Sequence, residues 1–453
     1  MLLVIILMGA AAAGGYFGAH EIRVHSDHRV TPRPTSTPSV LAAATAAPSS
    51  APPRTAAVPS AAGVAGAVAA EVADPALGAR VVAQIVDAET GSVLYDHLGS
   101  TPVAPASTAK LLVAAALLAV RAPTDRIVTT VVAGPPGTVV LVGGGDPTLT
   151  SAPAGRQGAY ADAARIGELA DQLRAAHVSV RHVIVDDALY SGPLVSPQWA
   201  AEDVPSSYAA PVTAVMADGG RAALNDTVRS ATPDLDAGRR LADAVGASTA
   251  TVARGSAQAG AATLATVRSA PLSELVEQML QQSDNVIAEC LARQVAIARH
   301  APASFAGAAA SVRAVLAGLG ADPGAGMYDG SGLAAGDRLS AVSLAAVLRL
   351  IVGAQQPELH DIVTALPVAA WSGTLESRYV STAAGKAGAG VVRAKTGTLA
   401  AVSSLAGIVH DADGRLLVFA LVADQVPAGE TATHAAEAAL DRVASTLATC
   451  GCR

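Results

Sequence analysis

The stretch GVVRAKTGTLAAVSSLAGIVHDADGRLLVFALVADQ, residues 390–425, predicts two neighbouring β-strands joined by the turn HDADG. Toward the other end of the chain, RVVAQIVDAETGSVLYDH (residues 80–97) has two β-rich runs around AETGS and is typical of a hairpin. A terminal helix is expected over residues 428–448. Strands near both ends with helices between them favour one antiparallel sheet built from both termini, in an α/β (α+β) fold.

The segments between these strands predict helices and an insertion. TAKLLVAAALLAV (108–120) is apolar on nearly every face, so we expect it to lie at the centre of its domain. PLSELVEQMLQQ (271–282) places its apolar residues on one helical face, and a helix resumes after SDN. We therefore predict a domain of residues 73–150 and 265–453, interrupted by a β-containing insertion of residues 151–264.

The first residues predict export. Residues 2–19 form an uncharged apolar run, which is near the lower limit for a membrane span and a little long for a signal-peptide core. We expect residues 1–20 to be a cleaved signal peptide or a membrane anchor. Residues 21–72 are rich in Pro, Ala, Ser and Thr, which indicates a disordered linker. The folded part is then expected at the outer face of the cytoplasmic membrane or in the cell wall, with the membrane contacted only through the N-terminal segment.

Composition argues against several classes of function. The formal net charge is −7 and no basic patch with interleaved aromatic residues occurs, so nucleic acid is not an expected partner. The 10 histidines show no paired-ligand spacing, so we expect no catalytic metal. Three cysteines do not make a disulfide framework, and Cys290 lies in an apolar helical pattern that predicts a buried side chain.

Lysine is rare in this chain, which contains only Lys110, Lys386 and Lys395. The first follows Ser107 by three residues, a spacing that puts both side chains on one face of a helix. A serine hydroxyl is a poor nucleophile until a neighbour takes its proton, and a lysine can do so as the neutral amine. Arginine cannot, because its guanidinium stays protonated. By itself, however, such a pair is usually an ordinary surface feature.

Two further motifs contain residues suited to binding a peptide. In Ser283-Asp-Asn285 the serine could pass a proton, and the asparagine amide could both donate and accept hydrogen bonds. In Lys395-Thr-Gly-Thr398, on a predicted strand, the lysine could hold an anion that the two hydroxyls orient. Gly397 would let a substrate backbone approach closely. Taken singly, these motifs are also compatible with a capped turn and an edge-strand lysine.

In this order the three motifs resemble those of the class C low-molecular-mass penicillin-binding proteins, the D-alanyl-D-alanine carboxypeptidase/endopeptidases of peptidase family S13. The resemblance covers most of residues 79–448. It includes the segments LVGGGDPTL (141–149), YAAPVTAVMADGG (208–220), YDGSGLAAGDRLSA (328–341) and LPVAAWSGTLESR (366–378). It implies a β-lactamase/transpeptidase-like domain, with a central antiparallel sheet flanked by helices and an insertion between the first two motifs.

The resemblance also implies a mechanism that needs no cofactor. Ser107 would attack the carbonyl between the two D-alanines of a peptidoglycan stem peptide, while Lys110 takes its proton. Ser283 would relay the proton to the leaving nitrogen, and Asn285 would hold the substrate amide. A β-lactam would acylate Ser107 and leave slowly.

The remaining roles concern binding. The backbone N–H groups of Ser107 and Thr398 would form the oxyanion hole. Recognition of the terminal carboxylate would fall on Lys395, Thr396 and Thr398, beside Gly397. Recognition of the stem side chain could fall on Asp203, Tyr208 and Arg338.

Other functions stay open at this point. The chain could be a non-catalytic sensor that binds stem peptides or β-lactams. A class A β-lactamase is less favoured, because no E-x-x-x-N occurs: Arg221 stands four residues before Asn225. The insertion could also be a docking module for partners in wall synthesis.

Overall fold

The computed structural model describes residues 56–380 and 383–453. The N-terminal apolar segment and most of the predicted linker lie outside these residues. Among the described residues no helix is long and apolar enough to span a membrane.

The first sheet is antiparallel and has the strand order β2-β1-β10-β9-β8. Its strands are β1 (Val81–Asp87), β2 (Val93–His97), β8 (Arg393–Leu399), β9 (Val402–His410) and β10 (Leu416–Ala423). Val81 of β1 pairs with Ala423 of β10, so strands from both ends of the chain meet at the centre of the sheet. The predicted hairpin and the union of strands from both ends in one sheet are confirmed. The first strand of the predicted pair, within residues 390–409, is instead two strands, β8 and β9, because the chain turns at residues 400–401.

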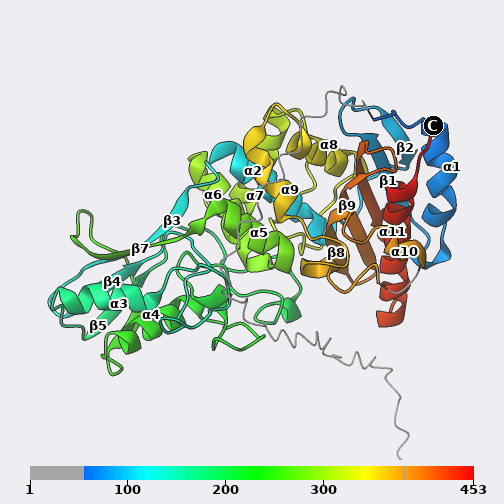
Figure 1. The fold of residues 1–453 in the computed structure, drawn as a ribbon. Coiled ribbons are helices and arrows are strands. Elements are labelled where there is room, and N and C mark those ends of the chain that lie inside the picture. Colours follow the sequence, from blue (N-terminus) through cyan, green and yellow to red (C-terminus); the bar gives the residue numbers. More distant parts are fainter. Residues whose placement is uncertain (1–55, 381–382) are drawn as a thin grey trace, which may run out of the picture. The chain divides into compact units, whose positions relative to one another are not determined.

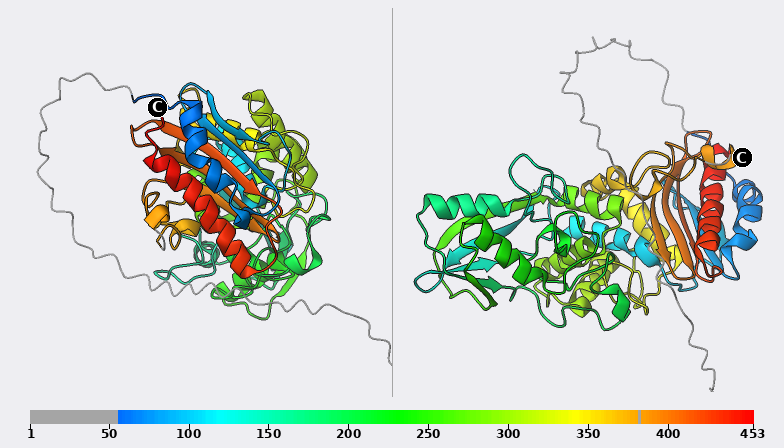
Figure 2. Two further views of the ribbon diagram at one scale, coloured as in Figure 1. Left: turned by 90° about the vertical axis from the view of Figure 1, so that its right-hand side faces the viewer. Right: turned by 90° about the horizontal axis from the view of Figure 1, so that it is seen from below.

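Helices cover both faces of this sheet (Figures 1 and 2). On one face, α11 (Glu430–Thr449) packs against β9 and β10, with α1 (Ala61–Val72) beside it. On the other face, α8 (Ala341–Val352) packs against β1 and β10. The predicted terminal helix and the α/β fold class are thereby confirmed.

Helix α1 corrects one predicted boundary. Its residues belong to the segment expected to be linker, but Val64, Val68 and Val72 are buried in the apolar layer between the sheet and α11. They recur every four residues, so one face of a short Ala-rich helix covers apolar surface that would otherwise be exposed. The prediction of a linker up to residue 72 is therefore wrong for residues 61–72.

The second sheet has the order β6-β5-β4-β3-β7 and mixes parallel and antiparallel pairs. Its strands are β3 (Arg126–Ala133), β4 (Thr138–Val142), β5 (His182–Asp186), β6 (Thr251–Arg254) and β7 (Thr263–Pro271). Two helices pack on it, α3 (Ile166–Ala175) and α4 (Pro233–Ala244). Because β3 pairs with both β4 and β7, the interrupting region begins near residue 126 and not at residue 151 as predicted.

A layer of helices lies between the two sheets (Figure 1). It contains α2 (Lys110–Val120), α5 (Leu272–Gln282), α6 (Asn285–Ala298), α7 (Phe305–Gly318) and α9 (Asp361–Ala365), while the short α10 (Ala383–Lys386) lies beside α11. Residues 111–118 of α2 are all buried, as predicted for a central helix. Cys290 on α6 is buried, also as predicted.

Candidate active site

Ser107 lies in a tight 3-10 turn, Ala106–Ala109, directly before α2. Ala106 has a positive φ of 49°, a strained conformation for a residue with a Cβ atom. The turn is fastened to the first sheet, because the Ser404 hydroxyl on β9 donates to the carbonyl of Pro105 over 2.9 Å. The start of α2 therefore holds Ser107 beside the edge strand β8.

Gly397 allows this close approach. A Cβ atom at this position would lie 2.8 Å from the backbone nitrogen of Ser107 and would also collide with the Ser404 hydroxyl. Glycine is thus needed here so that β8 can lie against the serine, a different reason from the substrate contact expected from the sequence.

Replacing Gly397 with alanine is expected to slow acylation of Ser107 by about 10²-fold, because misplacing a reacting group by about 1 Å costs that much. Gly167→Ala on α3 is the matched control, since a Cβ there meets no atom within 4 Å. Rates of acylation by labelled penicillin measure the effect. Equal rates in the two variants would show that the position of β8 does not matter to Ser107.

Lys110 is completely buried, and its Nζ contacts three oxygen atoms. It lies 2.7 Å from Ser107 Oγ, 2.6 Å from Asn285 Oδ1 and 2.8 Å from the carbonyl oxygen of Ser331. Burial lowers the pKa of Lys110 to about 8, although the carboxylates of Asp329, Asp284 and Glu289 oppose the shift. At neutral pH, a larger fraction of Lys110 is therefore the neutral amine than is the case for an exposed lysine.

Ser283 and Asn285 lie where α5 ends and α6 begins. Ser283 ends α5 in the left-handed conformation, and its hydroxyl lies 2.9 Å from Lys395 Nζ. The Asn285 amide nitrogen donates to the carbonyl of Tyr208 over 3.2 Å. The three motifs, far apart in the sequence, therefore meet through the two lysines.

Asp284, to which the sequence assigned no role, fixes this turn. One carboxylate oxygen accepts from the first backbone N–H groups of α6. The other accepts from the Tyr160 hydroxyl and from Arg229, both over 2.8 Å. Burial alone would raise the pKa of Asp284, but Arg229 and Arg221 hold it well below its ordinary value. Because Tyr160 and Arg229 belong to the interrupting region, that region supports the turn directly.

Lys395 is also completely buried on β8, and its Nζ donates to the Thr396 carbonyl over 2.7 Å. Burial, together with the nearby Lys110 and Arg378, lowers the pKa of Lys395 well below its ordinary value. Lys395 therefore gives up its proton more readily than an exposed lysine does. A carboxylate bound beside it would favour the ammonium form by Coulomb attraction.

The hydroxyls that follow Lys395 have partners within the protein. Thr396 donates to the Thr374 hydroxyl over 2.8 Å, and Thr398 donates to the Glu437 carboxylate over 3.1 Å. A hydroxyl has one proton, so Thr398 can bind a substrate carboxylate only after it turns away from Glu437.

The loop 328–334 contributes the contact that sequence reasoning missed, the Ser331 carbonyl on Lys110. Asp329 shapes this loop by accepting from the backbone N–H of Gly332 over 2.7 Å and from the Trp199 indole over 2.6 Å. Buried Glu289 accepts from the N–H of Ser331 over 2.8 Å. The segment 328–341 is one of those that resemble the family. The contact with Lys110 uses a backbone carbonyl, which every residue type has, so the sequence could not reveal it.

The three residues expected to recognise the stem side chain are placed differently from one another. Tyr208 reaches the site through its carbonyl, while its side chain is 53% exposed. The Asp203 carboxyl has its pKa raised by partial burial and by Glu202. Arg338 is exposed, and its guanidinium donates to the carbonyls of Ala335 and Asp337 in its own loop. Of these three residues, Tyr208 is the one that a hydrogen bond joins to a motif residue.

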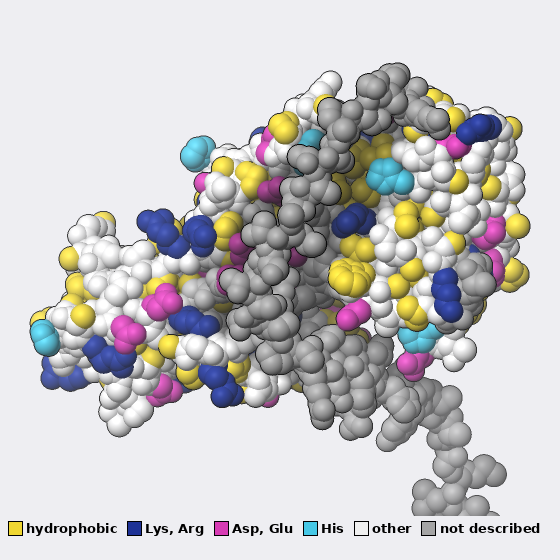
Figure 3. Space-filling view, in the orientation of Figure 1, with side chains coloured by type: hydrophobic (Ala, Val, Ile, Leu, Met, Phe, Trp, Pro, Cys, Tyr) yellow, Lys and Arg dark blue, Asp and Glu magenta, His cyan; other side chains and the backbone are white. Residues whose placement is uncertain are grey.

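Within the two described ranges, no group of three or more His, Cys, Asp and Glu side chains could hold a metal ion. On the face drawn in Figure 3, basic and acidic side chains are interspersed. A serine hydroxyl 2.7 Å from the Nζ of a buried lysine, on a mixed α/β fold, is the arrangement expected of a serine enzyme that uses a lysine base.

Comparison with known proteins gives the family. The chain matches the D-Ala-D-Ala carboxypeptidase 3 (S13) family over residues 64–227 and 222–447. It is 42% identical over 461 residues to Carboxypeptidase DacB of Mycolicibacterium smegmatis, covering 99% of this chain and 96% of that protein. It is 44% identical over 396 residues to a carboxypeptidase of Mycobacterium tuberculosis, covering 86% and 84%.

The fold has a counterpart among crystal structures. Penicillin binding protein 4 (dacB) from Haemophilus influenzae superposes with a TM-score of 0.69 at 20% sequence identity, covering 84% of this chain and 97% of that chain. The chain therefore belongs to the S13 family of D-Ala-D-Ala carboxypeptidases, as the three motifs predict.

Proposed function

We propose that the protein is a serine D,D-peptidase that cleaves the terminal D-Ala–D-Ala bond of peptidoglycan stem peptides through an acyl-enzyme on Ser107. Membership of the S13 family supports this activity. The observation that carries the proposal is the set of three contacts around the buried Nζ of Lys110.

Those contacts suit a neutral amine. Such an amine has two N–H bonds and one lone pair. The Ser331 carbonyl and the Asn285 amide oxygen accept hydrogen bonds only, so they occupy the two N–H bonds. The lone pair is left for the Ser107 hydroxyl, which lies 2.7 Å away. Lys110 is thereby arranged to accept the proton of its neighbour.

The reaction then follows in two steps. Ser107 Oγ attacks the carbonyl carbon, its proton passes to Lys110, and the N–H groups of Ser107 and Thr398 stabilise the oxyanion. The C–N bond breaks as the proton taken up by Lys110 is relayed to the leaving nitrogen through the Ser283 hydroxyl, which returns Lys110 to its neutral form. Water then hydrolyses the ester and releases the shortened peptide and free Ser107.

The proposal includes the setting of the reaction. The substrates are peptidoglycan stem peptides outside the cytoplasm, and β-lactams act as covalent inhibitors at Ser107. A crystal structure of the H. influenzae protein contains a β-lactam, which supports the second point. Residues 1–20 would direct export or anchor the chain at the outer face of the cytoplasmic membrane.

Release of D-alanine from a pentapeptide ending in D-Ala-D-Ala tests this function. Wild-type protein is expected to release it, and Ser107→Ala is not. Penicillin acylation without any release of D-alanine would favour the non-catalytic sensor. Rapid turnover of penicillin would instead favour a β-lactamase.

The rate of acylation is expected to rise with pH. Lys110 acts as the neutral amine, and with a pKa of about 8 only roughly one-tenth of it is neutral at pH 7. Acylation by labelled penicillin should therefore increase nearly tenfold between pH 7 and a plateau above pH 9. A rate that falls over this range would show that the protonated lysine is the active form.

A further inference from the structure

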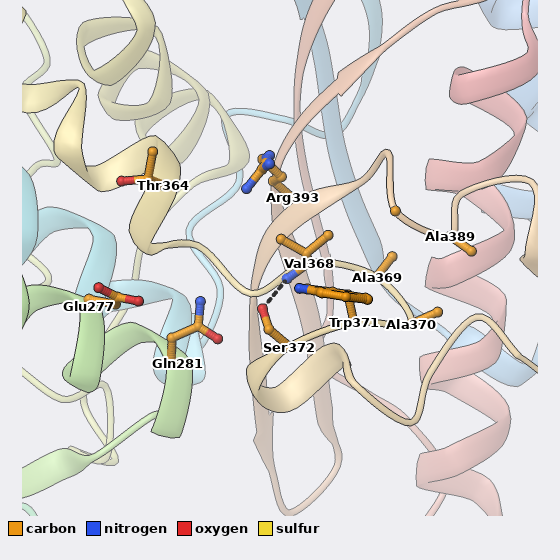
Figure 4. Close-up of a pocket in the computed structure, with 11 residues that line it drawn as sticks. Glu277, Gln281, Thr364, Val368, Ala369, Ala370, Trp371, Ser372, Ala389 and Arg393 are labelled. Atoms are coloured by element: carbon orange, nitrogen blue, oxygen red, sulfur yellow. Dashed lines mark hydrogen bonds between the residues drawn. The ribbon is translucent and has the colours of Figure 1, made fainter. Parts of the chain in front are cut away.

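A pocket of about 750 Å³ lies next to the candidate active site but does not contain Ser107 (Figure 4). Its size is within the range of ligand sites in proteins. Glu277 and Gln281 line it from α5, Arg393 lines it from β8, and Trp371 and Ser372 line it from the loop that precedes residue 373. The mechanism proposed above uses none of these side chains.

The pocket borders the catalytic groups on two sides. Gln281 stands two residues before Ser283 on α5, and Arg393 stands two residues before Lys395 on β8. Gly373 packs so closely on Gln281 that a Cβ atom would collide with its amide oxygen, and the adjoining Thr374 accepts from Thr396. A molecule in the pocket would therefore lie beside the place where the stem peptide reacts.

The polar groups of the pocket are available to a ligand. In the described part of the chain, neither the guanidinium of Arg393 nor the carboxylate of Glu277 makes a hydrogen bond or an ion pair. Figure 4 shows Glu277 and Gln281 pointing into the pocket from one side and Arg393 from the other. The opposite charges favour a ligand without net charge, because an anion would meet Glu277 and a cation would meet Arg393.

Trp371 adds a flat apolar surface. Its side chain is 77% exposed, in a chain in which aromatic residues are only 3% of the total. An exposed indole gains by being covered, and its ring presents an apolar face beside a polar N–H. The pocket thus combines one apolar face with planar groups that donate and accept hydrogen bonds around it.

We propose that this pocket binds a neutral sugar ring of the peptidoglycan glycan strand. A pyranose has C–H faces that can stack on the Trp371 indole. Its rim of hydroxyl and amide groups matches the donors of Arg393, the acceptors of Glu277 and the amide of Gln281. The relevance of this site to catalysis rests on the proposed function, since the glycan carries the stem peptides. Binding itself does not depend on that function.

The probe is a β-1,4-linked oligomer of N-acetylglucosamine, titrated into the full chain. The protein has two tryptophans, and Trp199 is already buried against Asp329. A saturable change in tryptophan fluorescence is therefore expected from Trp371 as the sugar covers it. The absence of any saturable change, both by fluorescence and by calorimetry, would overturn the proposal.

Variants locate the binding site. Arg393→Gln and Glu277→Gln are each expected to weaken binding of the oligomer by about tenfold or more in calorimetry, because each removes charge-assisted hydrogen bonds. Glu274→Gln, one turn earlier on α5 and outside the pocket lining, should bind like wild type. Unchanged affinity in both pocket variants would place the sugar elsewhere and contradict the proposal.

A glycan-free pentapeptide separates the sugar from a peptide occupant. Added to Ser107→Ala, which does not consume it, the peptide should leave the fluorescence of Trp371 unchanged. If the peptide covers Trp371 and the sugar oligomer does not, the pocket is a peptide site and the proposal is wrong. Release of D-alanine by wild type is measured separately, so failure of the sugar site and failure of the peptidase function are distinguishable.

Discussion

Replacing Lys110 with arginine is expected to reduce acylation of Ser107 by about 10³-fold or more while the protein stays folded. A positioned general base contributes roughly 10²–10⁴-fold to a rate, and a guanidinium cannot serve because it stays protonated. The three acceptors around Lys110 Nζ would all receive N–H groups, so the Ser107 hydroxyl would lose the lone pair that takes its proton.

Acylation by labelled penicillin, together with a thermal melt, measures this effect. Lys386→Arg is the matched control, because Lys386 is exposed on α10 and should tolerate the same change. Lys110→Met is a second variant that removes the amine without adding buried charge, in case arginine disturbs the packing. If Lys110→Arg and Lys110→Met both acylate at nearly the wild-type rate, Lys110 is not the base.

Replacing Arg229 with methionine is expected to cost about 3–5 kcal/mol of the free energy of unfolding, the usual effect of removing one partner of a buried ion pair. The side chains of Arg229 and Asp284 are only 4% and 3% exposed. The variant leaves the Asp284 carboxylate buried with no cation at hydrogen-bonding distance, although Tyr160 remains bound to it. Because this turn places Ser283 and Asn285, acylation should also slow.

Denaturant unfolding at neutral pH measures the change in stability. Arg239→Met is the matched control: Arg239 is exposed in its ion pair with Asp236, and pairs with an exposed partner contribute at most about 1 kcal/mol. The double variant Arg229→Met/Asp284→Asn should be more stable than Arg229→Met alone, because the unpaired buried charge is gone. If the double variant is the less stable of the two, burial of an unpaired carboxylate is not the cause.

The pH dependence of this ion pair follows from the direction in which folding shifts the pKa of Asp284. The folded pKa of Asp284 lies below its unfolded value, so the pair stabilises the protein above the unfolded pKa. This stability is lost as the pH falls through the lower, folded value. Near neutral pH both members of the pair are charged. The unfolding of Arg229→Met is therefore compared with that of wild type at a pH where the ion pair makes its full contribution to stability.

Much of the first sheet could be predicted because its information is local. Short turns separate β1 from β2 and β9 from β10, so both hairpins can be recognised from continuous stretches of sequence. The second sheet was predicted less well, since β3 pairs with β4 and also with β7, which follows only after β5 and β6 in the sequence. Neither β3 nor β7 carries a mark of this pairing, whereas the pairing of β1 with β10 was expected because β-rich runs stand at both ends of the folded chain.

The candidate site, like the fold, could be predicted only in part. Ser107, Lys110 and the residues around Ser283 and Lys395 were found because they stand in compact motifs in a chain with three lysines. The partners of Asp284 were missed, since Tyr160 and Arg229 are 124 and 55 residues away from it in the sequence. No spacing rule connects residues so far apart.

The sequence by itself determined which chemical groups are present: a serine three residues before a lysine, an amide beside a second serine, and a second lysine among hydroxyls. Only the tertiary structure decided how readily the two lysines give up a proton. Burial lowers the pKa values of Lys110 and Lys395, because a low-dielectric surrounding disfavours the ammonium form. That burial arises from α2, α6, β8 and the loop 328–334 packing together, a property of the folded chain and not of any single segment.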